Sequence, residues 1–257
     1  MNLQQSAANT PMPARRPAPA PPSGADGAPL LTFSPGFDLS FAKRLLGRKK
    51  GGKLSAATAK RLTRMQERFG RLVRPLVTYQ ERSIVRIEAD SVTLEGGVLL
   101  KSRKMARALC GARKVVAFIA TVGEKVDLEI EEMMEDGRMA NAYVGDALGS
   151  AAVERLANTF QNHLDRKLHH LGQTTGPRFS PGYCDWPITE QRKLFTLVQG
   201  SAARVTLGET SLMQPRKSIS AVFGVYDQHE VPATKYLIPC LRCGKKDCIA
   251  RRTEADA

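Results

Sequence analysis

The sequence predicts an α+β or mixed α/β fold, built as a single domain around a central, mostly antiparallel sheet with long helices. Three observations support this. Residues 84–100 alternate apolar and polar side chains as a two-stranded hairpin does. Residues 139–171 form the longest stretch with helical spacing of apolar residues. Further strand and helix patterns are interleaved with these two, as an α+β chain requires.

The N-terminal region combines a low-complexity arm with one basic helix. Residues 1–30 are rich in Pro, Ala, Ser and Gly without a hydrophobic period, so we expect them to be disordered. Residues 54–74 predict a helix with Ser55 as N-cap and Pro75 as its stop. Its apolar stripe is Leu62, Met65, Phe69 and Leu72, and its basic stripe is Arg61, Arg64, Arg68 and Arg71. The basic stripe is either a solvated flank or a surface that docks against a partner protein.

The middle of the chain has the pattern of a hairpin, then a buried strand that leads into a helix. Residues 115–120 are rich in β-branched and apolar side chains, which predicts the strand. The loop 121–124 leads into a helix of about 12 residues. A strand, a glycine-containing loop and a helix N-terminus can together hold an anion. With Gly123 as the single glycine, an ordinary strand-to-helix turn is the alternative.

The long helix 139–171 carries a polar row beside its apolar face. Asp146, Ser150 and Glu154 are spaced at i, i+4 and i+8, which places them on one side of the helix. Residues 149–152 are all small, so something approaches this part of the helix closely. A neighbouring element and a ligand are the two candidates.

The last part of the domain alternates again between helix and strand. Thr189 is a suitable cap for a helix that runs to Val198, and Gly200 is suited to end it. Residues 203–207 and 217–226 have strand patterns. Ser218 and Ser220 lie on one face of the second strand, because side chains in a strand alternate with a period of two.

Residues 178–187 are the most informative segment of the chain. Arg178 offers a planar fork of donors that suits a carboxylate or a phosphate. Pro181 and Gly182 predict a sharp turn. Tyr183 and Trp186 would then be displayed on a rigid loop. Such a loop suits a small molecule that has both an anionic group and a flat ring.

This segment resembles the Arg-x-x-x-Gly-Tyr motif of the activation (reactivation) domain of vitamin B12-dependent methionine synthase. Residues 213–220, Met-Gln-Pro-Arg-Lys-Ser-Ile-Ser, and the helix segment 146–154 are also similar to that family, particularly to its free-standing members. The pieces occur in the family's order over roughly residues 33–239. Residues 1–30 and 240–257 have no counterpart in that domain.

The resemblance implies an S-adenosylmethionine-binding protein that supports reductive methylation of a Co(II) cobalamin held by a partner. Arg178 would bind the methionine carboxylate, and Asp146 or Glu154 would balance the sulfonium or amino charge. Gly182, Tyr183 and the segment with Ser218 and Ser220 would border the ligand. The resemblance requires no general acid or base in this chain, so whether the protein is an enzyme in its own right stays open. The implied partner is a corrinoid-binding methyltransferase domain or protein, such as methionine synthase.

A cysteine cluster at the C-terminus predicts a metal centre. Cys240, Cys243 and Cys248 form a Cys-x2-Cys-x4-Cys pattern, and three thiolates so close together suit a soft metal. Cys184 is a candidate fourth ligand. The pattern suits an iron–sulfur cluster or a structural zinc, and unmetallated thiols are the third interpretation. We therefore divide the chain into a disordered arm (1–30), an activation-like domain (31–239) and a metal-binding tail (240–257).

The charge distribution limits the partners. The first 75 residues hold 14 Lys or Arg against 3 Asp or Glu, whereas residues 76–239 hold 20 against 19. A basic N-terminal region can steer an acidic partner, for which an electron-transfer protein is a candidate. For the main interpretation we expect no nucleic acid. The alternative function is a metal-knuckle module that contacts nucleic acid, and a third is a scaffold of the same fold without ligand. No membrane span or secretory signal is expected, so we predict a cytoplasmic protein.

Overall fold

The computed structural model describes residues 29–47 and 54–230 and has an α+β fold, as the sequence predicts. A seven-stranded sheet forms its centre, with the strand order β4-β3-β2-β5-β9-β6 and with β1 paired to β2. These pairings are all antiparallel. The strands of this sheet are β1 Leu30–Thr32, β2 Leu76–Ile87, β3 Ser91–Leu94, β4 Leu99–Lys101, β5 Lys114–Thr121, β6 Gln173–Phe179 and β9 Ser218–Asp227. A separate small hairpin consists of β7 Thr206–Leu207 and β8 Met213–Gln214.

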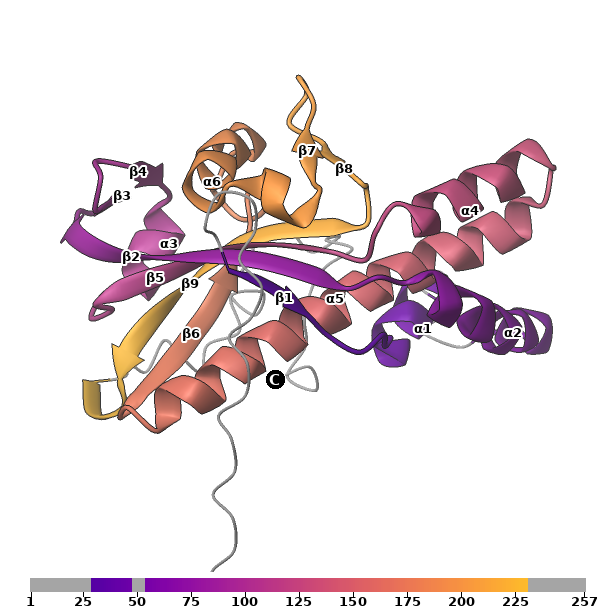
Figure 1. Ribbon diagram of the computed structural model, residues 1–257, viewed down its shortest axis with the longest axis horizontal. Helices are drawn as coiled ribbons and strands as arrows, with labels where there is room; N and C mark the ends of the chain where they lie inside the picture. The colour runs from indigo at the N-terminus through magenta and orange to yellow at the C-terminus, as the bar shows by residue number, and fades with distance from the viewer. Residues whose placement is uncertain (1–28, 48–53, 231–257) are drawn as a thin grey trace, which may run out of the picture.

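The helices cover both faces of the sheet. They are α1 Leu39–Gly47, α2 Ala56–Leu72, α3 Arg103–Ala108, α4 Lys125–Glu135, α5 Met139–His169 and α6 Gln191–Val198. Short 3₁₀ turns lie at Ile188–Glu190, Gly200–Ala203 and Gln228–Glu230. Figure 1 shows α5 running along one face of the sheet, while α3, α6 and the β7–β8 hairpin lie on the other. The 31 residues of α5 make it long enough to reach well beyond the sheet.

Each face of the sheet has its own hydrophobic core. Between the sheet and α5, the rings of Phe118, Phe160 and Phe223 have centroids 5.0 to 6.2 Å apart. On the opposite face, Val222 and Trp186 pack with residues of α3 and α6. Because successive residues of a strand point to opposite faces, Val222 and Phe223 of β9 serve different cores.

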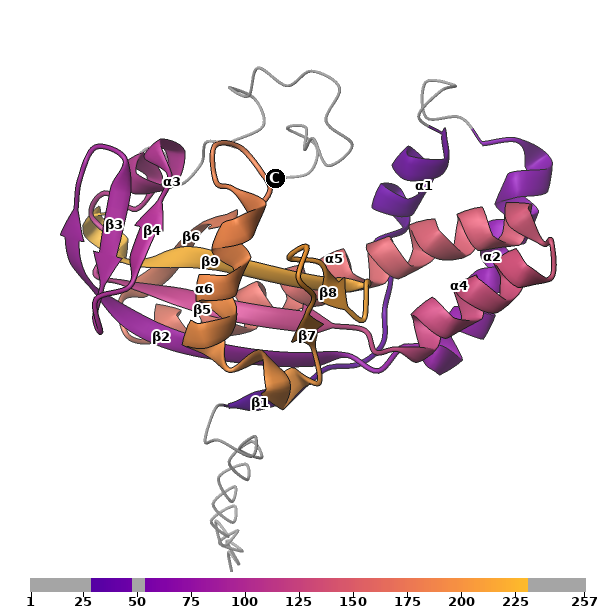
Figure 2. The same ribbon diagram turned by 90° about the horizontal axis from the view of Figure 1, so that it is seen from above.

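Helices α1, α2 and α4 and the first part of α5 extend beyond one end of the sheet, as Figures 1 and 2 show. Two arginines of the predicted basic stripe help to hold α2 in this extension. Arg61 donates from Nε to Asn141 Oδ1 at 2.8 Å, and Arg68 forms a 2.6 Å ion pair with Glu129. Arg64 and Arg71 remain exposed on α2. The basic stripe is therefore divided between internal contacts and the surface.

The positions of the long helices and strands are predicted well from the sequence, whereas those of the short elements are predicted poorly. Helix 54–74 is confirmed as α2, with Ser55 Oγ accepting from the Thr58 N–H at 3.2 Å. Helix 139–171 and strands 115–120 and 217–226 are confirmed as α5, β5 and β9. The expected strand 203–207 shrinks to Thr206–Leu207, after a 3₁₀ turn. A 3₁₀ turn rather than a Thr189 cap precedes α6, and Gln199, in a left-handed conformation, ends that helix instead of Gly200.

Replacing Gly176 in β6 with alanine is expected to destabilise the fold by about 1–3 kcal/mol. A Cβ at this position would lie 2.5 Å from the buried ring of Tyr226. The matched control is Gly70→Ala in α2, where a Cβ would meet nothing within 4 Å. This control is expected to gain up to about 1 kcal/mol through helix propensity. Urea denaturation measures both, and equal stabilities would show that the Tyr226 ring can move aside.

Candidate ligand-binding site

A row of polar residues on α5 faces two cations from the sheet. Arg178 of β6 forms a 2.7 Å ion pair with Glu154, and its second terminal nitrogen donates to Asn158 Oδ1 at 3.1 Å. The Arg178 side chain is only 5% exposed, against 25% for Glu154. The pair therefore lies in a partly dehydrated place where charge-assisted hydrogen bonds are strong. We call the row Asp146, Ser150 and Glu154, together with the two cations Arg178 and Lys217, the α5 seam.

The second cation of the α5 seam is Lys217, just before β9. Its Nζ lies 2.7 Å from Asp146 Oδ1 and 3.1 Å from Ser150 Oγ. Gly149 makes this possible, because a Cβ there would stand 2.9 Å from Lys217 Cγ. The close approach expected at residues 149–152 is thus made by a neighbouring element. On another side of the helix, Asp38 donates its N–H to the Ala151 carbonyl at 3.1 Å.

The register of the sheet explains why Arg178 points toward α5. The ladder between β6 and β9 shifts between Thr175 and Arg178, after which Arg178 lies opposite Phe223, a residue of the α5-side core. The same edge strand is fastened further along α5. Asp165 accepts the Thr175 N–H at 2.7 Å, and Gln161 donates to the Gly176 carbonyl at 2.8 Å. These contacts fix the position of β6 on the helix and hence the aim of Arg178.

The loop after β6 is closed by a backbone hydrogen bond, and it displays one aromatic side chain instead of the expected two. Gly182, with φ of 85°, donates its N–H to the Trp186 carbonyl at 2.8 Å. Tyr183 is 49% exposed, whereas Trp186 is 2% exposed and packs in the core beneath α6. The expectation that Trp186 is displayed for a ligand is therefore wrong. Burying this large apolar ring removes apolar surface from water, so it stabilises the fold more than displaying the ring on the loop would.

Asp185 anchors the same loop to α3. It accepts hydrogen bonds from Ser102 Oγ at 2.6 Å and from the Lys104 N–H at 3.1 Å. Burial alone would raise the pKa of the Asp185 carboxyl, but these hydrogen bonds bring it below its usual value. The next residue toward Tyr183 is Cys184, which is exposed and has a left-handed φ of 58°. The anchored loop presents Tyr183 and Cys184 together on the surface.

Ser218 and Ser220 lie on the opposite face of the sheet from the α5 seam. Lys217 reaches α5, so the alternation of β9 turns Ser218 and Ser220 toward the other face. The Ser218 hydroxyl lies 2.9 Å from Thr121 Oγ1 and donates to the Pro215 carbonyl at 2.7 Å. Both serines are buried. The structure thus joins Asp146, Glu154 and Arg178 in one seam but separates these two hydroxyls from it.

Asp127 is a residue that the sequence reasoning missed. It lies in the first turn of α4 and accepts the Arg216 N–H at 2.5 Å, which ties the segment before β9 to that helix. Burial raises the pKa of Asp127, while the Arg216 N–H and the charges of Arg216 and Lys217 act in the opposite direction. An acidic residue in the first turn of a helix was the available signal.

Because burial raises the pKa of Asp127 above 3.8, its ionised form is disfavoured in the folded state. Its contribution to stability is therefore expected to fall as the pH rises from about 3.8 through the raised pKa. Asp127→Asn keeps an oxygen acceptor for the Arg216 N–H but does not titrate. The difference in free energy of unfolding, wild type minus variant, should decrease across this window in urea titrations. Asp90→Asn, at an exposed carboxyl, is the control. A difference that grows with pH would contradict the prediction.

The predicted metal ligands cannot be assembled from the described part of the chain. Cys240, Cys243 and Cys248 lie outside the described residues. Within residues 29–47 and 54–230, no three His, Cys, Asp or Glu side chains are grouped closely enough to hold a metal ion. Of the four predicted ligands, the structure therefore places Cys184 alone.

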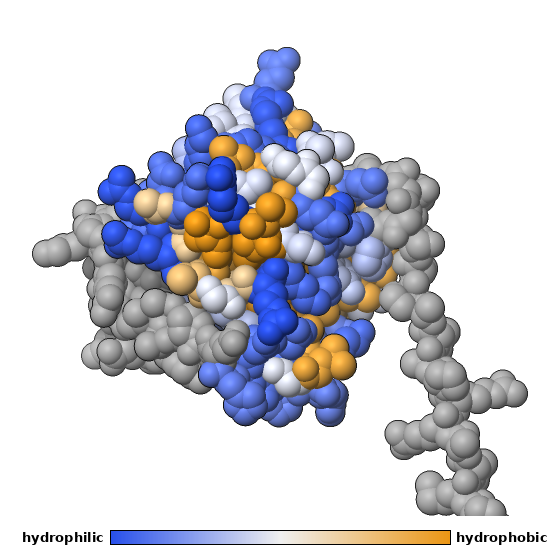
Figure 3. Space-filling view, turned by 90° about the vertical axis from the view of Figure 1, so that its left-hand side faces the viewer, coloured by the Kyte–Doolittle hydropathy of each residue, from blue (hydrophilic) through white to orange (hydrophobic). Residues whose placement is uncertain are grey.

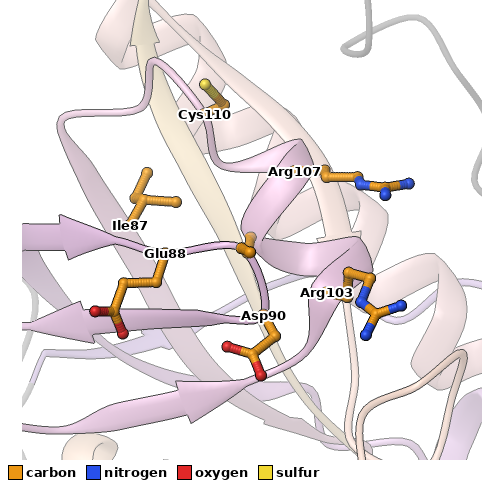
Figure 4. Close-up of a pocket in the computed structure, with 8 residues that line it drawn as sticks. Ile87, Glu88, Asp90, Arg103, Arg107 and Cys110 are labelled. Atoms are coloured by element: carbon orange, nitrogen blue, oxygen red, sulfur yellow. The ribbon is translucent and has the colours of Figure 1, made fainter.

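An open hollow of about 620 Å³ lies between the β2–β3 turn and α3, at the end of the sheet opposite to α2 and α4. Glu88 and Asp90 lie on one side of it, with Arg103 and Arg107 on the other, as Figure 4 shows. Figure 3, which views this end of the molecule, shows an apolar area surrounded by hydrophilic residues. None of the site residues predicted from the sequence lines this hollow, which separates it from the α5 seam.

The fold and the seam together define a class: an α+β domain that carries a row of paired charges between its longest helix and the edge of an antiparallel sheet. Among solved structures, the chain is similar to the MetH reactivation domain bound to AdoHcy. The TM-score is 0.59 at 16% sequence identity, and the match covers 81% of each chain. The two therefore share a fold. No family model and no curated protein matches the sequence.

Helix α5, with 31 residues, is the longest helix of the described part of the chain. None of the described helices combines the length and the apolar character that crossing a membrane requires.

Proposed function

We propose that this protein binds S-adenosylmethionine and supports the reductive methylation of a cobalamin or related corrinoid held by a partner methyltransferase, such as methionine synthase. The observation that carries the proposal is the Arg178–Glu154 pair, which joins β6 to α5 in a fold shared with a domain whose crystal structure contains AdoHcy. An α-amino acid end group has a carboxylate and an ammonium side by side. A guanidinium and a carboxylate 2.7 Å apart offer one counter-ion to each.

The residues of the α5 seam divide the work of binding. Arg178 binds the carboxylate of the ligand, and Glu154 faces its ammonium. Asp146 is paired with Lys217, whereas Glu154 lies beside Arg178, the cation proposed for the ligand carboxylate, so Glu154 is the better placed of the two predicted carboxylates. Gly182 and Tyr183 border the ligand from the anchored loop. When bound, S-adenosylmethionine supplies a methyl group on a sulfonium, and the chain orients it toward the partner and excludes water.

Isothermal titration calorimetry with S-adenosylmethionine and S-adenosylhomocysteine tests the proposal directly. Binding of either ligand supports it. A protein that binds neither ligand but still binds a corrinoid protein would be a scaffold of the same fold. Binding to DNA or RNA that weakens steeply with salt, without binding of either ligand, would favour a nucleic-acid module.

The cysteine tail is the second part of the proposal. We propose that residues 31–239 form the ligand-binding domain and that Cys240, Cys243 and Cys248, with Cys184, hold an iron–sulfur cluster or a zinc ion. The exposed position of Cys184 beside Tyr183 supports this, because a metal there would lie next to the ligand loop. An iron–sulfur centre would relay an electron, whereas zinc would hold the tail over the loop. Metal analysis and absorption spectra of protein prepared without oxygen distinguish these cases, and metal-free protein would contradict both.

The exposed arginines of α2 give the partner proposal a sharper test. Arg64→Glu combined with Arg71→Glu is expected to slow association with an acidic corrinoid or electron-transfer partner by about tenfold at low salt. Arg61→Glu would be a poor probe, because Arg61 contacts Asn141 inside the fold. Stopped-flow association at two salt concentrations measures the effect. An unchanged rate at low salt would remove this face of α2 from the partner surface.

A further inference from the structure

Lys217 is a nearly buried cation within the proposed ligand site. Its side chain is 11% exposed, although lysine side chains generally extend into water. Three features hold it there: Asp146 at 2.7 Å, Ser150 at 3.1 Å, and the missing side chain of Gly149, over which its methylene groups lie. Its backbone is also fixed, since the Lys217 carbonyl accepts the Val122 N–H at 3.2 Å. The ammonium thus has a defined place.

The position of this ammonium places it within electrostatic reach of a ligand in the α5 seam. Asp146 and Glu154 are eight residues apart on α5, or about 12 Å of helix rise. A ligand whose amino acid end sits between Arg178 and Glu154 has its sulfur three carbon–carbon and carbon–sulfur bonds away from that end. With its side chain extended along α5 toward Ser150, such a ligand would hold its sulfur within roughly 12 Å of the Asp146–Lys217 pair.

We propose that Lys217 determines how strongly the site distinguishes the sulfonium of S-adenosylmethionine from the neutral thioether of S-adenosylhomocysteine. This inference rests on the proposed function. The two ligands differ by one methyl group and one positive charge, so their affinity ratio reports the charge of the site. By neutralising Asp146, Lys217 removes the negative charge that would otherwise favour the sulfonium. The chain thereby holds both ligands with more similar affinities than a bare carboxylate would allow.

The two halves of the pair give opposite predictions. Lys217→Met leaves Asp146 without its counter-ion and should raise the preference for S-adenosylmethionine over S-adenosylhomocysteine by about fivefold. Asp146→Asn leaves the ammonium uncompensated and should lower the same preference by about fivefold. The double variant should return close to the wild-type ratio. Glu81 and Lys114, whose 2.6 Å ion pair lies between β2 and β5, provide the matched control pair.

Calorimetry with both ligands on all variants tests the proposal, and circular dichroism shows which variants are folded. Asp146 is 52% exposed, so its asparagine variant decides the matter even where Lys217→Met fails to fold. Ratios that move in opposite directions for the two single variants, and stay constant for Glu81→Gln and Lys114→Met, are the expected result. Unchanged ratios in a wild type that binds both ligands would overturn this inference alone. A wild type that binds neither ligand would overturn the proposed function together with it.

Discussion

Replacing Arg178 with alanine is expected to lower the affinity for S-adenosylmethionine by about 30- to 1000-fold, which corresponds to about 2–4 kcal/mol. The Arg178 side chain is 5% exposed and its guanidinium bonds Glu154 and Asn158 at once, so a ligand carboxylate would meet a donor that is already oriented. Calorimetry of wild type and variant measures the loss. Equal affinities would remove Arg178 from the site.

The same substitution also affects folding, and the two effects are separable. Without Arg178, Glu154 keeps a partly buried charge without its ion-pair partner, which should cost about 1–3 kcal/mol of stability after allowance for its 25% exposure. Arg178→Lys retains the positive charge but loses the planar fork, so it should retain most of the stability and lose most of the affinity. Arg113→Ala is the control, because its ion pair with Asp227 is exposed and should contribute under about 1 kcal/mol.

The parts of the fold that could be predicted are those with a repeated pattern. The apolar face of residues 139–171 repeats over many helical turns, and the predicted helix matches α5 within two residues. Strand β6 was missed, because Gln173–Phe179 contains a glycine and a proline and reads as a loop. Its strand structure comes from long-range partners: β9 on one edge, and Gln161 and Asp165 of α5. Such contacts are invisible to local periodicity.

The candidate site, too, could be predicted only where it depends on local geometry. The spacing of Asp146, Ser150 and Glu154 on a helix correctly placed them in one row, because helix geometry is local. Their partners were not predictable, since Lys217 and Arg178 reach the row only through the sheet register. A motif resemblance does not show which face of the sheet the Ser218 side chain lies on. Assigning that face requires the position of α5 against the sheet.

Replacing Trp186 with alanine is expected to destabilise the fold by about 3–5 kcal/mol. The side chain is 2% exposed and packs in the core between the sheet, α3 and α6, so its removal leaves a cavity there. The Trp186 backbone carbonyl also accepts the Gly182 N–H across the loop after β6, and the buried ring anchors that stretch of backbone to the core. The loop that presents Tyr183 is therefore held by a buried ring, and the two aromatics of the motif have different roles.

Tyr183→Ala is the matched comparison for this prediction. Tyr183 is 49% exposed, so its loss should change the free energy of unfolding by less than about 1 kcal/mol while weakening ligand binding. Urea denaturation has to be followed by circular dichroism, because Trp186 is the only tryptophan of the chain and the variant loses its fluorescence. A Trp186→Ala protein as stable as Tyr183→Ala would show that the ring does not pack in this core. A Trp186→Ala protein that is unstable, yet binds ligand at low temperature as tightly as wild type, would show that Tyr183 is positioned without it.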